Sequence, residues 1–562
     1  MPGVICYRTP SQDCALLGHL YRSSPHSDTT VRPPRHERQS VRPRNSTITC
    51  PPPLAFPLNS NRTLELPALS VSSLLVLLPE VILLILAELP GQDIVRCRYV
   101  CRILKEFIDQ SAVLQYIAQA DVRGLEPLRH SGLAHLRLSY LLLRERNWEM
   151  FGSTPGIQVA LTNTLYSDDD PTPKPHFINN AGKLLLYCGQ RLVVHSLRPR
   201  GLVTTKEYEL PGLENSRHVA TIQEDILAFC STDAVQLYSI PTNEVIRVLS
   251  APQRGVIDSV CGRGSYVVAL FHPERRCNGV LIWNWKCGSL IGMFHCADTP
   301  VLSFTLLNDV TLVVVRTNRD AGSVRLDTYN IGVRSVTFRS SLALPDAHPT
   351  KWYAKADIYA GSNLAQSGSE RFNDEEGVVV VDIELRIRAA HFNGDTTEQL
   401  STILVLHKRA VLNSFFITPP GRSPELISWP LWSANQFRVI TGVRLTSQYS
   451  IWGHRIVTIG PESDQISLFD FGPIGVRMAS QVWKPGSSWG ANTIRGGGVS
   501  VRAALAQRAR TLVRANAFKV GVGWFDGMKP MADQMPYVVS VRRGVVGVED
   551  AMLDGECIVT LV

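Results

Sequence analysis

The sequence lacks the short patterns that mark several large classes of enzymes and secreted proteins. Its 12 cysteines include no Cys-x-x-Cys pair, and there is no Walker phosphate loop and no His-Glu-x-x-His metal helix. Residues 1–8 do not show the charged region and apolar run that begin a secretory signal. These absences favour a reducing, intracellular protein, and we expect it in the cytoplasm, the nucleus or both.

A strongly basic composition is also missing from most of the chain. The formal net charge is +8, but residues 1–62 hold eight arginines, no lysine and three acidic residues, so the other 500 residues carry about +3. This charge is too small for a surface that follows nucleic-acid phosphates, so no nucleic-acid partner is expected. The proline- and arginine-rich residues 1–62 have no apolar periodicity, and we predict a disordered basic arm there.

Sites for metals, cofactors or catalysis are not indicated either. Cys97, Cys101, His130 and His135 could be written as a zinc set, but their spacing on helices suits a single tetrahedral site poorly. The acidic run at 168–170 lies in a Ser/Pro-rich stretch and is typical of a solvated loop. We therefore predict no catalytic residue, no cofactor and no metal.

The most apolar stretch of the chain covers residues 64–89. It is long enough for a membrane span of ~20 residues. However, Pro79 and Glu80 interrupt it, and a carboxylate at the bilayer centre costs at least ~2.5 kcal/mol. Both residues suit the first turn of a helix, where proline is favoured and an acid meets the positive end of the helix dipole. We predict no membrane span and a helix from Pro79 to Leu89.

Capping residues and periodicity predict three more short helices after Pro90-Gly91. They are a second helix capped by Asp93 with Ile94, Val95 and Cys97, a third from Tyr99 or Val100 to Asp109, and a fourth capped by Ser111 with Leu114 and Ile117. The first helix is apolar in nearly every direction and needs cover on all sides. A bundle of ~40 residues is too small to provide it. Either the rest of the chain or a separate protein covers the far side.

These residues resemble the F-box pattern. The runs LPEVILLILAELP at 78–90 and DIVRCRYVCR at 93–102 carry its Leu-Pro opening and Val-Cys pair at the expected separation. Residues 107–109, 111–116 and 144–148 are similar to the continuation in F-box proteins of mushroom-forming (basidiomycete) fungi. The resemblance implies an F-box at 74–120 that binds a Skp-type adaptor and, through it, a cullin and its RING subunit.

The resemblance also implies which side chains face the adaptor. They are Leu78, Pro79, Ile82, Ile85, Leu86 and Leu89 of the first helix with Val100, Cys101 and Leu104 of the third. The four between Ile82 and Leu89 follow an i, i+3, i+4, i+7 stripe that would equally suit the core of the bundle. Which stripe faces the adaptor is left open. At 103–105 the chain departs from the many F-boxes that carry a tryptophan or phenylalanine there.

Residues 121–151 are expected to form a linking helical segment. Leu133, Leu136, Tyr140 and Leu143 recur at helical spacing and predict its buried face, and charged residues follow at 144–146. Such a helix would hold the F-box at a fixed distance from the residues that follow it.

Residues 152–562 change to short apolar runs between Gly, Pro, Asn and Asp, typical of strands in an all-β domain. The clearest runs are 183–187, 191–195, 225–229, 235–239, 266–271, 279–285, 311–316 and 466–471. The blocks 226–249 and 267–294 share one order of run, turn and hairpin, and the second ends like a WD-type propeller blade. No Trp-Asp dipeptide occurs, so we expect a degenerate β-propeller. At ~40–45 residues per blade, and with long insertions at 360–376 and 485–500, about seven blades are expected. A pair of β-sandwiches would give similar strand spacing.

The expected fold class is therefore α+β and multidomain, with a small helical F-box bundle followed by a large all-β, propeller-like domain. We predict a non-catalytic substrate-receptor subunit of a Skp-cullin-F-box ubiquitin ligase, whose β domain binds an unknown protein substrate. Two alternatives are an F-box scaffold that acts without the ligase and an orphan propeller enzyme. The enzyme would need polar residues that converge in the central channel.

Overall fold

A computed structural model describes part of the chain. The described residues are 77–127, 134–149, 157–159, 176–180, 183–188, 190–198, 201–210, 218–223, 225–274, 278–295, 299–318, 323–347, 351–361, 371–372, 376–387, 399–414, 426–432, 437–441, 443, 445, 450–459, 465–472, 510–513, 537–543, 550–553 and 558–561. The predicted basic arm at 1–62 lies outside them, as do His130 and Leu133.

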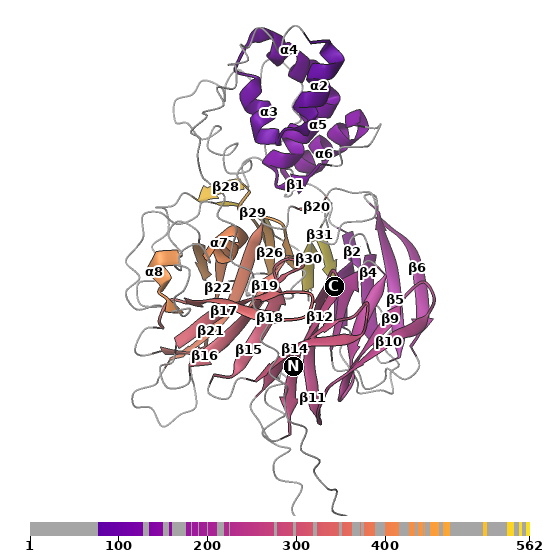
Figure 1. The fold of residues 1–562 in the computed structure, drawn as a ribbon, viewed down its shortest axis with the longest axis vertical. Coiled ribbons are helices and arrows are strands. Elements are labelled where there is room, and N and C mark those ends of the chain that lie inside the picture. Colours follow the sequence, from indigo (N-terminus) through magenta and orange to yellow (C-terminus); the bar gives the residue numbers. More distant parts are fainter. Residues whose placement is uncertain are drawn as a thin grey trace, which may run out of the picture. The chain divides into compact units, whose positions relative to one another are not determined.

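Four helices form a bundle between residues 79 and 122. They are α2 (Pro79–Glu88), α3 (Gly91–Cys97), α4 (Arg102–Gln110) and α5 (Ala112–Val122) (Figure 1). Pro79 and Glu80 occupy the first turn of α2, as predicted. The predicted cap of α5 is also confirmed, since the Leu114 N–H donates to Ser111 Oγ at 3.4 Å. None of the described helices is long and apolar enough to cross a membrane.

Two details of the predicted helices are wrong. Asp93 does not cap α3, which begins at Gly91; its carboxylate instead accepts a hydrogen bond from Arg96 at 2.6 Å, one turn on. The next helix begins at Arg102 and not at Tyr99 or Val100, because residues 98–100 form a turn. This turn presents Tyr99 and Val100 to solvent.

The linking segment contains the short strand β1 (Leu125–Glu126) and the helix α6 (Ala134–Glu149). The predicted buried face of α6 is wrong for its described members, because Leu136, Tyr140 and Leu143 are exposed. The helix instead buries Leu141 and Trp148, so its covered face is rotated from the apolar stripe.

Most of the described strands from residue 176 onward form a β-propeller whose six blades are sheets of four or five strands. In chain order, the blades are β3 (His176–Asn180), β4 (Lys183–Cys188), β5 (Arg191–Arg198) and β6 (Gly201–Glu209); β7 (Val219–Gln223), β8 (Ile226–Cys230), β9 (Ala234–Ser239) and β10 (Glu244–Ser250); β11 (Gly255–Arg263), β12 (Tyr266–Pro273), β13 (Gly279–Asn284) and β14 (Ser289–His295); β15 (Val301–Leu306), β16 (Thr311–Asn318), β17 (Ser323–Ile331) and β18 (Val336–Ala343) with β23 (Leu426–Ile427); β19 (Lys351–Ala360), β21 (Val378–Ile387), β22 (Gln399–His407) and β24 (Phe437–Thr441); and β25 (Ile451–Trp452), β26 (Arg455–Ile459), β27 (Gln465–Asp470), β29 (Tyr537–Arg543) and β28 (Arg510–Val513).

Both faces of the inner strands are buried, which explains why the sequence shows apolar runs and not strict alternation. On β13, Leu281 and Trp283 pack into a core shared with the preceding blade, whereas Val280 and Ile282 pack into a core shared with the following blade. The other core clusters likewise join successive sheets. One apolar layer therefore lies between each pair of blades that follow one another in the chain, from the first to the sixth.

Six blades are fewer than the seven expected from repeat length. Two blades use a fifth strand, because β23 adds to β18 and β28 adds to β29. A separate three-stranded sheet joins β2 (Ile157–Val159), β31 (Ile558–Leu561) and β30 (Asp550–Leu553), with β2 parallel to β31. The two sequence ends of the domain are thus tied by backbone hydrogen bonds.

Two short helices and one short strand complete the described elements of the propeller domain. They are α7 (Lys408–Asn413), α8 (Trp429–Trp432) and β20 (Arg371–Phe372). β20 pairs with β1 of the linking segment, with Leu125 opposite Phe372 and Glu126 opposite Arg371.

Candidate functional site

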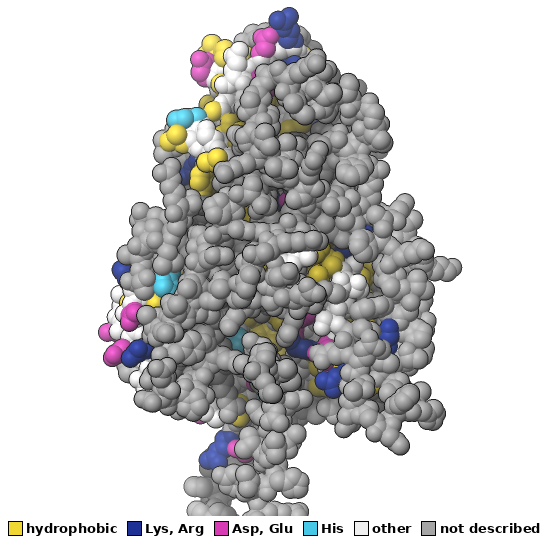
Figure 2. All heavy atoms as spheres, turned by 180° about the vertical axis from the view of Figure 1, so that it is seen from behind, with side chains coloured by type: hydrophobic (Ala, Val, Ile, Leu, Met, Phe, Trp, Pro, Cys, Tyr) yellow, Lys and Arg dark blue, Asp and Glu magenta, His cyan; other side chains and the backbone are white. Residues whose placement is uncertain are grey.

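The outer face of α2 is an exposed apolar surface. Leu78, Val81, Leu84 and Ile85 are all exposed, and Leu84 keeps 69% of its area open to solvent. Figure 2 shows hydrophobic side chains next to charged ones at the surface of the end that carries the helices. Large apolar side chains in such numbers on one small bundle are typical of a protein interface.

A second exposed apolar set lies where α3 leads into α4. Tyr99 is 81% exposed, and Val100 and Ile103 are also open to solvent. Backbone hydrogen bonds hold the turn, from the Tyr99 N–H to the Arg96 carbonyl at 3.0 Å and from the Val100 N–H to the Cys97 carbonyl at 3.1 Å. The structure therefore presents these side chains from a held turn.

The structure divides the nine side chains that the sequence proposed as adaptor-facing into three groups. Leu78, Pro79, Ile85 and Val100 are exposed, and Leu89 and Cys101 are half-buried. Ile82, Leu86 and Leu104 are buried in the core of the bundle together with Ile94, Ile108 and Leu114. Ile82 and Leu86 therefore take the core position that the sequence left open for the stripe, and Leu104 joins them from α4.

Gly91 allows α3 to pack closely on α5. A Cβ at this position would lie 2.5 Å from Asp121 Cβ and 2.9 Å from the Ile117 carbonyl oxygen. The neighbouring Gln92 N–H donates to Asp121 Oδ2 at 3.0 Å, which satisfies an open amide in the first turn of α3. Gly91, the first residue of α3, therefore sets the close spacing between α3 and α5.

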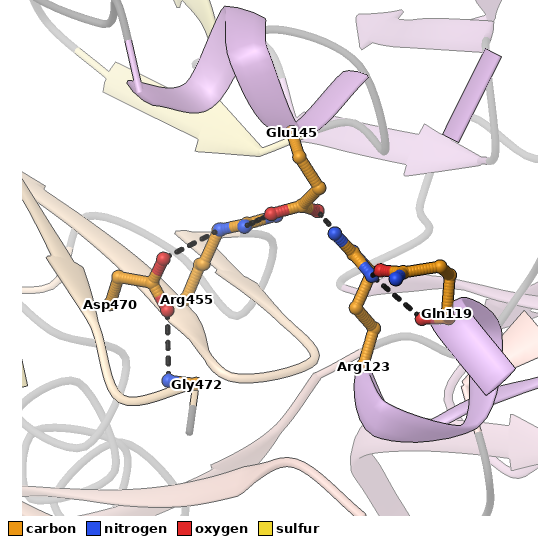
Figure 3. Close-up of polar contacts among 6 residues, drawn as sticks. All are labelled: Gln119, Arg123, Glu145, Arg455, Asp470 and Gly472. Carbon is orange, nitrogen blue, oxygen red and sulfur yellow. Dashed lines mark hydrogen bonds and ion pairs between the residues drawn. The ribbon is translucent and has the colours of Figure 1, made fainter. Parts of the chain in front are cut away.

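A buried ion-pair network connects the linking helix α6 to the propeller strand β26 (Figure 3). Arg455 Nη2 donates to Glu145 Oε2 at 2.9 Å, and Arg455 Nε lies 3.3 Å from Asp470 Oδ2. Arg123, at the end of α5, places its Nε 3.9 Å from Glu145 Oε1. One guanidinium therefore lies between carboxylates from a helix and from a propeller strand.

Aromatic rings surround this network. Trp148 of α6 stacks on Trp452 of β25 with ring centroids 6.4 Å apart. The Arg455 guanidinium lies 5.0 Å from the Trp148 ring centroid, and the Arg144 guanidinium lies 5.3 Å from the Trp452 ring centroid. Cation–π contacts of this kind are stronger away from water, so the rings reinforce the ion pairs.

Burial by itself lowers the pKa of Arg455. The negative charges of Asp470 and Glu145 and their hydrogen bonds outweigh that effect, and the pKa of Arg455 is raised overall. Arg455 is therefore held in its charged form between its two partners. Arg455 has a structural role, because it connects α6 to the propeller strands. The apolar side chains of α2 and of the α3–α4 turn take no part in this contact and are exposed.

Sequence reasoning missed several of these residues. Leu84, Tyr99 and Ile103 were absent from the expected contact set, although the all-round apolar character of the first helix was a signal for Leu84. In the sequence, Glu145 belongs to a charged run at the end of the predicted helix. Nothing in a single sequence links it to Arg455, which lies 310 positions away.

Comparison with known proteins agrees with the helical part of this description. The F-box domain model matches residues 74–116, so this region is an F-box domain. No curated protein matches the chain. The F-box implies an adaptor-type role in a ubiquitin ligase.

Solved structures with similarity to the chain include three from different proteins. Hydrazine synthase of Kuenenia stuttgartiensis is 9% identical with a TM-score of 0.38, covering 70% of this chain and 94% of that one. Hsv2 of K. marxianus is 8% identical with a TM-score of 0.26, covering 52% and 93%. The C-terminal WD40 domain of Sif2 is 11% identical with a TM-score of 0.29, covering 53% and 84%. All three scores are below 0.5, so the propeller assignment stands on the sheet order of this chain.

Proposed function

We propose, from the premise that residues 74–116 form an F-box domain, that this chain is the substrate-receptor subunit of a Skp-cullin-F-box ubiquitin ligase. The observation that carries the proposal is the exposed apolar face of α2 with the neighbouring turn at 98–100. A Skp-type adaptor would cover these side chains and connect the chain to the cullin and its RING subunit.

In this proposal the surface that contacts the adaptor differs from the one that the sequence predicted. The adaptor meets Leu78, Pro79, Ile85 and Val100, with Leu89 and Cys101 at the border. Ile82, Leu86 and Leu104 support that surface from inside the bundle. Leu84, Tyr99 and Ile103 join it, because each is exposed.

The chain itself performs no chemistry in this role. It brings a lysine of the cargo near a ubiquitin-charged enzyme that other subunits hold, so its contribution is proximity. The ion pair of Glu145 and Arg455 favours a defined placement of the F-box relative to the cargo-binding propeller. We further propose that the protein acts in the cytoplasm, the nucleus or both, and that it is of the type found in mushroom-forming fungi.

Quantitative pull-down of a Skp-type adaptor and cullin tests the proposal. The native chain should capture both, and the Leu78→Ala/Pro79→Ala double variant and Leu84→Ala should each lose at least fivefold of the captured adaptor. Leu431→Ala is the matched control, because Leu431 of α8 is 67% exposed against 69% for Leu84 but lies in the propeller.

Each result has a defined meaning. Equal loss in Leu431→Ala, or no capture by the folded native chain, would refute the proposal. Capture of the adaptor without cullin would favour the alternative of a scaffold that works apart from the ligase.

A further inference from the structure

The outer strand of the second blade, β10, is unusually open to solvent. Six of its seven residues are exposed, and Leu249 alone is buried. The exposed residues include Val245, Ile246 and Val248, three β-branched side chains in one short strand. Proteins normally protect such an apolar edge, because its backbone groups can pair with another strand.

Two other blades of the same propeller show what covers an edge in this position. On β18, the fourth strand of its blade, Ser341 pairs with Leu426 and Leu342 with Ile427 of the added strand β23. Ser341 and Leu342 are buried, whereas Phe338, outside the paired part of β18, is exposed. β28 covers β29 in the sixth blade in the same way, but antiparallel.

The hydrogen-bond pattern of β10 shows which backbone groups point outward. The Ala251 N–H donates to the Asp233 carbonyl, so residues 251 and 233 form a hydrogen-bonded pair of the β9–β10 ladder. Because such pairs alternate in an antiparallel ladder, the N–H and carbonyl groups of Val248 and Ser250 face away from β9. Among the described strands, β10 has β9 as its sole neighbour in the sheet.

We propose that β10 is a docking edge where a partner protein adds an extended segment as the fifth strand of the second blade. Main-chain hydrogen bonds to Val248 and Ser250 supply the attachment, and β-branched side chains of the segment pack against Val245 and Val248. The inference deepens the proposed function, since it states what the cargo presents to the propeller.

Charge near the edge indicates a further property of the segment. Arg247 is exposed on β10 and Lys286 in the β13–β14 turn, whereas the one carboxylate of β10, Glu244, stands at its first position. Arg247 reaches that turn, because a Cβ at Gly288 would lie 2.4 Å from Arg247 Nη1. An acidic residue in the added segment would pair with these cations.

A second copy of the chain fits this edge less well. Stable interfaces use about 20–30 residues on each side, whereas β10 has seven. A segment that adds one strand gains its affinity from main-chain hydrogen bonds along the edge and needs no second globular surface.

The test uses 12-residue random peptides displayed on phage and selected on the folded full chain. Enriched peptides are synthesised, and their affinities are measured by fluorescence anisotropy for the native chain, Val248→Pro and Val248→Thr. Proline removes the outward N–H of Val248 without removing a bond to β9, and threonine keeps both the N–H and the branched shape. The expected result is at least tenfold weaker binding to Val248→Pro and near-native binding to Val248→Thr, with acidic, β-branched residues enriched.

Several results would overturn the proposal. If the peptides bind Val248→Pro and the native chain with equal affinity, they dock elsewhere. If no peptide is enriched, β10 is not a docking edge. A native dimer in light scattering that Val248→Pro dissolves would assign the edge to a second copy. Arg247→Glu provides a second variant if Val248→Pro does not fold, and it should weaken the binding of acidic peptides. Adaptor capture is measured in parallel and should be unchanged in every β10 variant, so failure here is distinct from failure of the ligase role.

Discussion

Arg455 of β26 and Glu145 of α6 lie 310 positions apart in the sequence, yet their side chains meet at 2.9 Å in a partly buried ion pair. Asp470 shares the same guanidinium, and its second carboxylate oxygen accepts the Gly472 N–H at 2.8 Å. The Arg455 guanidinium therefore attaches the linking helix α6 to the sixth blade.

Removing Arg455 should destabilise this attachment strongly. Arg455→Ala leaves the buried Asp470 without its cation and Glu145 with only the more distant Arg123, and loss of one member of a buried ion pair typically costs about 3–5 kcal/mol. We expect urea denaturation to show a lower unfolding midpoint with earlier exposure of Trp148. Arg102→Ala is the control, because the Arg102–Glu106 pair is largely exposed and its loss should leave the midpoint unchanged. Equal midpoints for native and Arg455→Ala would show that the network contributes no stability.

A side chain at Gly91 should disrupt the F-box bundle. Gly91→Ala brings a Cβ within 2.5 Å of Asp121 Cβ, and overpacking of this kind costs roughly 1–3 kcal/mol. Circular dichroism during heating should show a lower melting temperature, together with weaker adaptor capture. In Gly332→Ala, the control, the nearest atom is 3.3 Å away, so a smaller change is expected. The prediction fails if both alanines melt together with the native chain.

The sequence predicted the individual strands better than the way in which they pair into blades. The run 183–187 lies in β4 and the run 279–285 spans β13, because apolar segments between turn residues depend on local chemistry. The blade count could not be obtained in this way. β23 and β2 join strands that are distant in the sequence, and no local pattern marks such pairing.

The site was predicted in a similar, partial way. The Leu78-Pro79 opening and the stripe from Ile82 to Leu89 located the F-box, which the domain match confirms. The orientation of α6 was missed, because the sequence showed an apolar stripe through Leu136 that the structure leaves exposed. The buried face of this helix includes Arg144 and Trp148, whose partner Trp452 belongs to a distant blade.

Acid should weaken the propeller through His454. Burial, with the nearby charges of His407 and Arg455, lowers the pKa of His454 to about 3. Glu376 lies 3.8 Å from Nε2, beyond hydrogen-bond distance, and does not reverse this shift. The unfolded histidine titrates near ~6.5, so below that pH the unfolded state binds the extra proton. Stability is therefore lost as the pH falls from about 6.5 toward 3, by up to ~1.4 kcal/mol per pH unit.

Denaturation midpoints at pH 7.5, 6 and 5 measure this effect. His454→Gln should show a shallower loss of stability with acid than the native chain. His135→Gln is the control, because His135 is exposed on α6. Parallel pH profiles for the native chain and His454→Gln would mean that this histidine does not titrate on unfolding.

Cys287 should react with thiol reagents before Cys261 does. A hydrogen bond with Ser289, helped by the charge of Arg247, lowers the pKa of the exposed Cys287 thiol. Burial raises the pKa of Cys261 to about 12. Because the thiolate is the reactive form, brief treatment with iodoacetamide should label Cys287 first, as read by mass spectrometry of peptides. Ser289→Ala should slow its labelling, and faster labelling of Cys261 would contradict the assignment.

Ile82 and Ile85 provide a direct comparison of the two faces of α2. They are the same residue type, three positions apart on one helix, but Ile82 is 2% exposed and Ile85 is 42% exposed. Ile82→Ala removes buried atoms from the bundle core and should cost about 2–5 kcal/mol of stability. Ile85→Ala should leave the melting temperature close to native and lower adaptor affinity, since truncation at an interface anchor costs ~1–2 kcal/mol, or roughly fivefold to thirtyfold.

Melting curves and adaptor titrations on the same preparations separate the two effects. If Ile85→Ala lowers the melting temperature as much as Ile82→Ala does, the exposed face supports the fold and the adaptor must bind elsewhere. If Ile82→Ala, measured at a temperature where it remains folded, loses affinity while Ile85→Ala does not, the stripe from Ile82 to Leu89 faces the adaptor after all. Loss of affinity in Ile85→Ala alone would assign the adaptor to the face that the propeller leaves open.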